Sequence, residues 1–164
     1  MAASVRNVMR VLVVVTSAGL LAGACGGKSR LTKAQYEQKV NQIGRQLSTT
    51  LDTTFSAPKL QNAGSLKEAA DVLKAGQRRL QEAADRLDRL NPPEQIETIH
   101  DQLVKGFRDF ATAFGHFAQA TEEGDLPAVQ RFNQQVSEQT LPAMIEIQKA
   151  IDQLKAKGFD VSKG

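Results

Sequence analysis

Four long stretches of this chain repeat apolar residues every three or four positions, and this spacing constrains the fold more than any other feature. Such an interval places apolar side chains on one face of an α-helix, whereas a half-buried strand alternates every second residue. No stretch of the chain alternates convincingly with the strand period. The sequence therefore predicts an all-α fold.

The first two helices are expected at roughly residues 32–55 and 65–90. Each begins with a Thr or Ser that is followed three positions later by Gln or Glu, which is the pattern of a capping box. In the second helix the apolar positions form a strict seven-residue repeat, which favours left-handed, coiled-coil-like packing. The repeat consists of Leu66, Ala69, Leu73, Gly76, Leu80, Ala83, Leu87 and Leu90.

The third helix is expected to begin at the Asn91-Pro92-Pro93 link and to end at Glu123. Proline is favoured in the first turn of a helix, so we expect Asn91 to be the N-cap. Gly124 then ends the helix, because glycine readily adopts the left-handed conformation of a C-terminal cap.

The fourth helix is expected to run from an Asp125 cap to about Lys157. Pro142 lies inside this range and removes a helical hydrogen bond, so we expect a kink or a break near residues 139–141. Gly158 ends the helix and leaves a tail at residues 158–164.

Four amphipathic helices with short links favour an up-down-up-down four-helix bundle over residues 32–157. A three-helix or an extended hairpin arrangement is the alternative. Four comparable apolar stripes fit a closed core better than either.

The N-terminal 24 residues have a different character from the helical region. Arg6 and Arg10 precede an apolar run at residues 11–24, which ends in small residues. This order is typical of a secretory signal peptide. As a helix the run would be about 21 Å long, which is short of the roughly 30 Å of a bilayer's hydrocarbon core. We therefore expect residues 1–24 to be removed.

The stretch Leu21-Ala22-Gly23-Ala24-Cys25 resembles the lipobox of bacterial lipoproteins, and Cys25 is the only cysteine of the chain. In the usual lipobox a leucine stands three residues before the cysteine, where this chain has Ala22. The resemblance implies cleavage between Ala24 and Cys25 and attachment of a diacylglyceryl group to the Cys25 thiol. The protein would then be anchored at the extracytoplasmic face of the cell membrane, with residues 25–31 as the tether.

Several short motifs of the remaining chain are similar to those of a group of small, secreted or lipid-anchored actinobacterial helical proteins. They are Leu31–Tyr36, Leu90–Pro93, Glu123–Asp125 and Lys157–Phe159. The resemblance covers most of residues 31–162. Relatives often carry cysteines at the positions of Gly44 and Ser162, so the resemblance implies that this chain lacks a disulfide between its two ends. This group has no assigned biochemical activity, so the resemblance implies location and fold only.

The charge of the chain argues against a nucleic-acid partner. The formal net charge is +3, and it falls to +1 when Arg6 and Arg10 leave with the signal peptide. A chain with this balance lacks the basic surface that nucleic acids require.

The spacing of the histidines and carboxylates does not predict a metal site or a haem site. Glu97 and His100 have the Glu-x-x-His spacing of di-iron bundles, but the only other histidine, His116, has Ala113 three positions before it. We interpret Glu97 and His100 as solvated surface residues. No nucleophile can be matched with a base and an orienting acid either. We expect no cofactor and no enzymatic activity.

A row of phenylalanines in the third helix is the one pattern with a sharper functional meaning. Phe107, Phe110, Phe114 and Phe117 recur at helical spacing, and Gly76 interrupts the facing apolar stripe. The rings either fill a solid core or, together with Gly76, line an apolar pocket. We therefore expect a non-enzymatic binding or interaction module at the cell envelope, with an unidentified partner. The alternative is a carrier of a small apolar ligand or of a metal cofactor.

Overall fold

A computed structural model of the protein describes residues 29–54 and 63–161, and this part of the chain is all-α and contains no strand. The prediction of the fold class is therefore confirmed. In none of the described helices is there a segment long and apolar enough to cross a membrane. The elements are α1 (Lys33–Thr54), α3 (Leu66–Asp88), the 3-10 helix η1 (Glu94–Ile96), α4 (Glu97–Glu123), α5 (Leu126–Ser137) and α6 (Pro142–Ala156).

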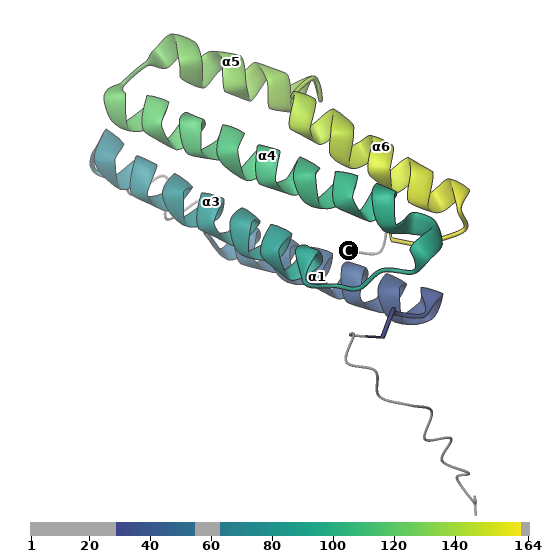
Figure 1. Cartoon of the computed structure of the whole chain (residues 1–164). Helices are drawn as coiled ribbons and strands as arrows, with labels where there is room; N and C mark the ends of the chain where they lie inside the picture. Colours follow the sequence, from purple (N-terminus) through teal and green to yellow (C-terminus); the bar gives the residue numbers. More distant parts are fainter. Residues whose placement is uncertain (1–28, 55–62, 162–164) are drawn as a thin grey trace, which may run out of the picture.

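Helix α4 lies in the middle of an elongated bundle (Figure 1). It packs against α3 on one side and against α5 and α6 on the other, while α1 packs on α3. Successive arms run in opposite directions, with α5 and α6 together forming the fourth arm (Figure 1). The bundle thus has the expected up-down-up-down order, although its fourth arm is two helices.

The first two helices begin at the predicted capping residues. The Thr32 backbone N–H donates to Gln35 Oε1 at 3.0 Å, and the Gln35 N–H donates to Thr32 Oγ1 at 3.3 Å, which completes a capping box. At the start of α3, the Glu68 N–H donates to Ser65 Oγ at 3.2 Å. The Glu68 carboxylate accepts from the Gly64 N–H at 2.7 Å.

The start of the third helix differs from the prediction. Asn91 is not its cap, because residues 91–93 have no helical conformation and α4 begins only at Glu97, after η1. A residue that precedes proline is pushed towards extended conformations. Pro93 restricts Pro92, and Pro92 restricts Asn91, so helical backbone starts only after the second proline.

The later turns follow the predicted residues. Gly124 is left-handed, with φ of 72°, and Asp125 Oδ1 accepts from the Ala128 N–H at 3.0 Å. The expected break occurs between α5 and α6, where Gln139 has φ of 57° and Pro142 becomes the first residue of α6. A proline is favoured at that position because its missing N–H has no helical partner there.

One end of the bundle, which we call the closed end, contains the main cluster of buried hydrophobic side chains. The start of α1, the end of α3, η1, the start of α4 and the end of α6 meet there (Figure 1). Its largest buried side chains are Tyr36, Leu87, Ile96, Leu103, Leu154 and Phe159, each at most 2% exposed.

Residues 159–161, which were predicted to be a tail, belong to this core. Phe159 is buried and packs edge-on against the Tyr36 ring, at 5.7 Å between centroids. The Asp160 N–H donates to Glu37 Oε1 at 2.9 Å, and Asn41 Nδ2 donates to the Asp160 carbonyl at 2.8 Å. The segment after α6 therefore joins α1 to the core.

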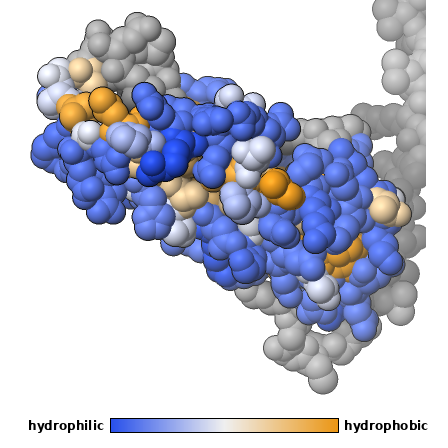
Figure 2. Space-filling model, turned by 90° about the horizontal axis from the view of Figure 1, so that it is seen from above, coloured by the Kyte–Doolittle hydropathy of each residue, from blue (hydrophilic) through white to orange (hydrophobic). Residues whose placement is uncertain are grey.

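The opposite end, which we call the aromatic end, is packed less deeply. It comprises the start of α3, the end of α4 and α5, and α5 has no fully buried residue. Leu66 and Leu126 are 54% and 63% exposed. On the face seen in Figure 2, hydrophobic residues show as separate areas between hydrophilic ones.

Candidate functional site

An apolar groove of about 510 Å³ lies between α1 and α6, within the range of roughly 300–1,000 Å³ that is typical of small-molecule sites. Its lining is mostly aliphatic, with one aromatic ring and three polar side chains. The lining residues are Val40, Ile43, Gly44, Leu47, Ser48, Leu51, Leu87, Leu103, Phe107, Gln148, Ile151, Lys155 and Val161.

The groove exists because α1 and α6 pack on other helices rather than on each other. Helix α1 packs on α3, and α6 packs on α4. Leu87 of α3 and Leu103 of α4, which are 2% and 1% exposed, form the floor between them. Gly44 adds width because it carries no side chain, and Val161 closes the groove at the closed end.

The groove has few polar side chains, and only one of them is charged. Ser48 comes from α1, and Gln148 and Lys155 come from α6. Gln148 Nε2 donates to the Asp152 carboxylate at 2.9 Å, and Asp152 itself does not line the groove. Within residues 29–54 and 63–161, Lys155 has no carboxylate at ion-pairing distance. The groove is therefore an apolar trough with one unpaired positive charge.

The predicted phenylalanine row is divided between two places. Phe107 lines the groove. Phe110, Phe114 and Phe117 lie at the aromatic end, where Phe117 stacks on Phe132 at 4.4 Å between centroids and Phe114 meets Phe132 edge-on at 5.9 Å. All four rings of this aromatic cluster are half-buried.

The other predicted site residues lie elsewhere. Gly76 is buried in α3 and is not among the residues that line the groove. Ala24 and Cys25 lie outside the described residues, so lipidation and cleavage there stay predictions. Sequence reasoning did not select Lys155 or Gln148, because a single lysine and glutamine on a helix with many charges give no distinctive pattern.

His100 corrects the interpretation of Glu97 and His100 as surface residues. The His100 side chain is only 2% exposed, and its Nδ1 is hydrogen-bonded to Tyr36 Oη at 3.1 Å. Its Nε2 is buried without a hydrogen-bond partner among the described residues. Glu97 is half exposed and is ion-paired with Arg30 at 2.9 Å.

Burial also shifts the acid–base behaviour of this pair. Desolvation lowers the pKa of His100, although the charge of Asp101, the nearby Leu87 backbone carbonyl and, more weakly, the charges of Asp88 and Glu97 oppose the shift. Desolvation raises the pKa of Tyr36. Both groups are thus neutral at pH 7, and their burial gives a substrate no access to them. The geometry is that of a core hydrogen bond rather than of a catalytic pair.

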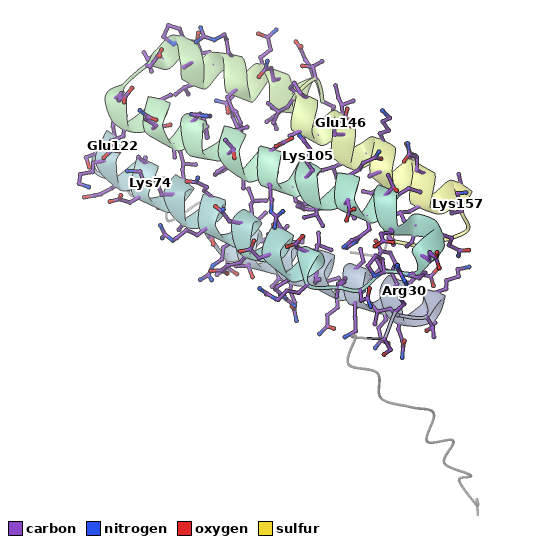
Figure 3. All side chains as sticks on the ribbon, viewed as in Figure 1. Arg30, Lys74, Lys105, Glu122, Glu146 and Lys157 are labelled. Carbon is purple, nitrogen blue, oxygen red and sulfur yellow. The ribbon has the colours of Figure 1, made fainter. Side chains whose placement is uncertain are left out.

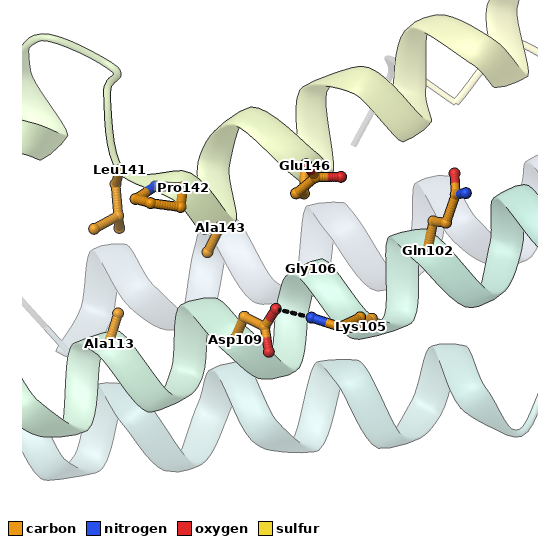
Figure 4. A pocket seen from close by; sticks show the side chains of 9 residues that line it. All are labelled: Gln102, Lys105, Gly106, Asp109, Ala113, Leu141, Pro142, Ala143 and Glu146. Carbon is orange, nitrogen blue, oxygen red and sulfur yellow. Dashed lines mark hydrogen bonds and ion pairs between the residues drawn. The ribbon is translucent and has the colours of Figure 1, made fainter.

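A second hollow, of about 530 Å³, lies where the break between α5 and α6 faces α4 (Figure 4). Its walls include Leu141, Pro142 and Glu146 on one side and the ion pair of Lys105 with Asp109 on the other. Asp109 pairs with Lys105, the one cation of this lining, and Glu146 adds a further negative charge, so the hollow offers no free cation to an anionic ligand.

Among the residues that the structure describes, no three or more His, Cys, Asp or Glu side chains are grouped so that they could hold a metal ion. No protein-family model, no curated protein and no solved structure matches this chain.

Proposed function

We propose that this protein is a lipid-anchored binding module at the extracytoplasmic face of the cell membrane, without enzymatic activity. The signal peptide at residues 1–24 would be cleaved between Ala24 and Cys25, and a diacylglyceryl group on Cys25 would hold the protein in the bilayer. A diacylglyceryl group carries two acyl chains, which anchor a protein stably where one chain binds only marginally. The binding role rests on one observation, which is the apolar groove between α1 and α6.

The contacts of residues 30 and 31 with the bundle support the proposal that the anchor holds the bundle close to the membrane. The Leu31 N–H donates to the Asn91 carbonyl at 2.8 Å, and Arg30 donates to the Pro92 carbonyl at 3.1 Å. Cys25 stands five positions before Arg30, the first docked residue, so the anchor can lie at most about 17 Å from it. Arg30 lies at the closed end together with Lys157 (Figure 3). The closed end would therefore face the bilayer, where cations favour an anionic leaflet.

Substitution of Cys25 tests the anchor. Cys25→Ala removes the thiol that carries the lipid. We therefore expect the variant to lack the mass of the diacylglyceryl group and to shift out of the membrane fraction. Intact mass and membrane fractionation in a bacterial host measure both effects. A wild-type protein with an unmodified Cys25 thiol would contradict the proposal.

A second candidate function, carriage of a small apolar ligand, is favoured by the volume and lining of the same groove. The two hypotheses, a protein partner that docks on the groove and a small ligand that fills it, predict different results. Native mass spectrometry of the purified protein separates them, because a carried ligand adds its own mass. Cross-linking in cells, followed by identification of the captured protein, tests the partner.

A further inference from the structure

We propose that the α1–α6 groove binds a single-chain amphiphile with an anionic head group, such as a long-chain fatty acid, and that Lys155 holds its carboxylate. This assignment rests on the proposed binding function and names its ligand. It does not depend on the lipid anchor at Cys25.

The shape of the groove fits a chain rather than a compact molecule. On α1 its lining extends from Val40 to Leu51, which is about 16 Å along the helix axis. On α6 it extends from Gln148 to Lys155, about 10 Å. A trough of this length between two helices accommodates an extended alkyl chain along its axis.

The lining of the groove fits an alkyl chain as well. Leu47, Leu51 and Ile151 are partly buried hydrophobic residues in its walls, and the Phe107 ring is half-buried there. These side chains leave apolar surface in contact with water. An alkyl chain that covers them removes this apolar surface from water, which favours binding.

Charge determines the other end of the ligand. Lys155 is the only charged residue among those that line the groove, and it has no carboxylate partner among the described residues. An unpaired ammonium group at the mouth of an apolar site favours an anionic head group over a neutral or cationic one.

Lys155 also lies at the appropriate end of the trough. It is next to the last residue of α6, beside the closed end, whereas Gln148 and Leu51 lie towards the middle of the bundle. Lys157, two residues further on, lies at the same end as Arg30 (Figure 3). The carboxylate would therefore lie at the closed end, with the alkyl chain running towards the aromatic end.

A photoreactive fatty acid tests the proposal on the full chain in phosphatidylcholine vesicles. The probe is palmitic acid with a diazirine in its chain, and the matching palmityl alcohol is the neutral comparison. After irradiation, peptide mass spectrometry locates the label. We expect labelling of groove residues on α1 and α6, with the acid exceeding the alcohol by about threefold, the size of an exposed ion-pair effect.

Two pairs of variants separate the head-group contact from the trough. Lys155→Gln is expected to lower labelling by the acid about threefold and to leave labelling by the alcohol unchanged, whereas Lys157→Gln changes neither. Ser48→Trp places a large ring in the groove from an exposed position and is expected to lower labelling by both probes on the order of tenfold. Thr49→Trp, one residue along and outside the lining, is the control.

The proposal is overturned if acid and alcohol label the groove equally, or if labelling is unaffected by Ser48→Trp. It is also overturned if cross-linking shows a second copy of the chain or residues 55–62 filling the groove. None of these results bears on the proposed lipid anchor, because the anchor is tested separately by fractionation of the Cys25→Ala variant. A captured envelope protein that displaces both probes from the groove would keep the binding module and overturn the amphiphile as its ligand.

Discussion

The two ends of the bundle are built from the same kinds of amphipathic helix, yet they differ in how completely they are packed. At the closed end, residues 159–161 pack against α1, and the core residues are almost fully buried. At the aromatic end, the rings of α4 and α5 are half-buried, and α5 buries no residue completely. Helical periodicity therefore specifies which face turns inward, but not how deeply it is buried.

Helix α3 shows this difference within a single repeat. Leu66 and Leu87 occupy equivalent positions of the seven-residue pattern, but Leu66 is 54% exposed and Leu87 is 2% exposed. The first lies at the aromatic end and the second at the closed end. The depth of burial thus depends on which other segments reach each position.

The largest effect is expected from truncating one ring at each end. Phe159→Ala should lower the free energy of unfolding by about 3–5 kcal/mol, because it empties a fully buried site. Phe132→Ala removes a ring that is already partly hydrated, so we expect a loss of only about 1–2 kcal/mol. Urea denaturation measures both, provided that the slopes agree. Equal losses would show that the two ends are packed alike.

An intermediate effect, with opposite signs, is expected at two glycines of α4. A Cβ at Gly106 would lie 2.8 Å from Ile147 Cγ1 and 3.3 Å from the Ile147 backbone nitrogen, so α6 would have to move. Gly106→Ala should cost about 1–3 kcal/mol. At Gly115, nearer the aromatic end, the added atom meets the flexible Gln77 amide, which can turn away.

Gly115→Ala should therefore be neutral or stabilising, by up to about 1 kcal/mol, because alanine favours helix more than glycine does. Thermal unfolding followed by circular dichroism gives the sign for each variant. A destabilised Gly115→Ala protein would mean that the aromatic end is as tightly packed as the contact between α4 and α6.

The smallest effect concerns pH. Burial lowers the pKa of His100 below the value of about 6.5 that it has in the unfolded chain. Below that pH the unfolded chain binds a proton that the folded protein does not, so stability falls as pH falls, by up to about 1.4 kcal/mol per pH unit. Measurements between about pH 5.5 and 7 avoid most carboxylate titration.

His100→Leu should remove this part of the pH dependence. His116→Leu, a substitution at an exposed position of α4 near the aromatic end, is the matched control. Urea midpoints at several pH values provide the comparison. An unchanged pH dependence in the His100→Leu protein would mean that another group is responsible.

Features decided by neighbouring residues were predictable from the sequence. The Thr32–Gln35 capping box, the left-handed Gly124 and the break before Pro142 all follow from local backbone chemistry. Asn91 failed as a cap because two successive prolines override the preference of one residue. That rule is also local and could have been applied.

The burial of His100 also had a signal in the sequence. It lies four residues after Ile96 and three before Leu103, which are both 1% exposed, so it belongs to the buried stripe. Its charged neighbours Glu97 and Asp101 obscured this position. The partner Tyr36 is 64 positions away, and no local pattern connects the two.

The groove was not predictable in the same way. Leu47, Leu51 and Ile151 belong to apolar stripes that look like ordinary core. Whether α1 and α6 meet or stay apart depends on how each packs on α3 and α4, which is a property of the whole bundle. The division of the phenylalanine row between groove and aromatic cluster has the same origin.

The contact of residues 159–161 with α1 has a consequence for the order of folding. Glu37 and Asp160 are 123 positions apart, so their hydrogen bond closes a very long loop. The α3–α4 hairpin needs a far shorter closure and is expected to form first, because loop-closure entropy rises with length. Helix α1 can also dock early, because it packs on its sequence neighbour α3. The segment at residues 159–161 would therefore dock last, and until then the part of Tyr36 that Phe159 covers stays in water.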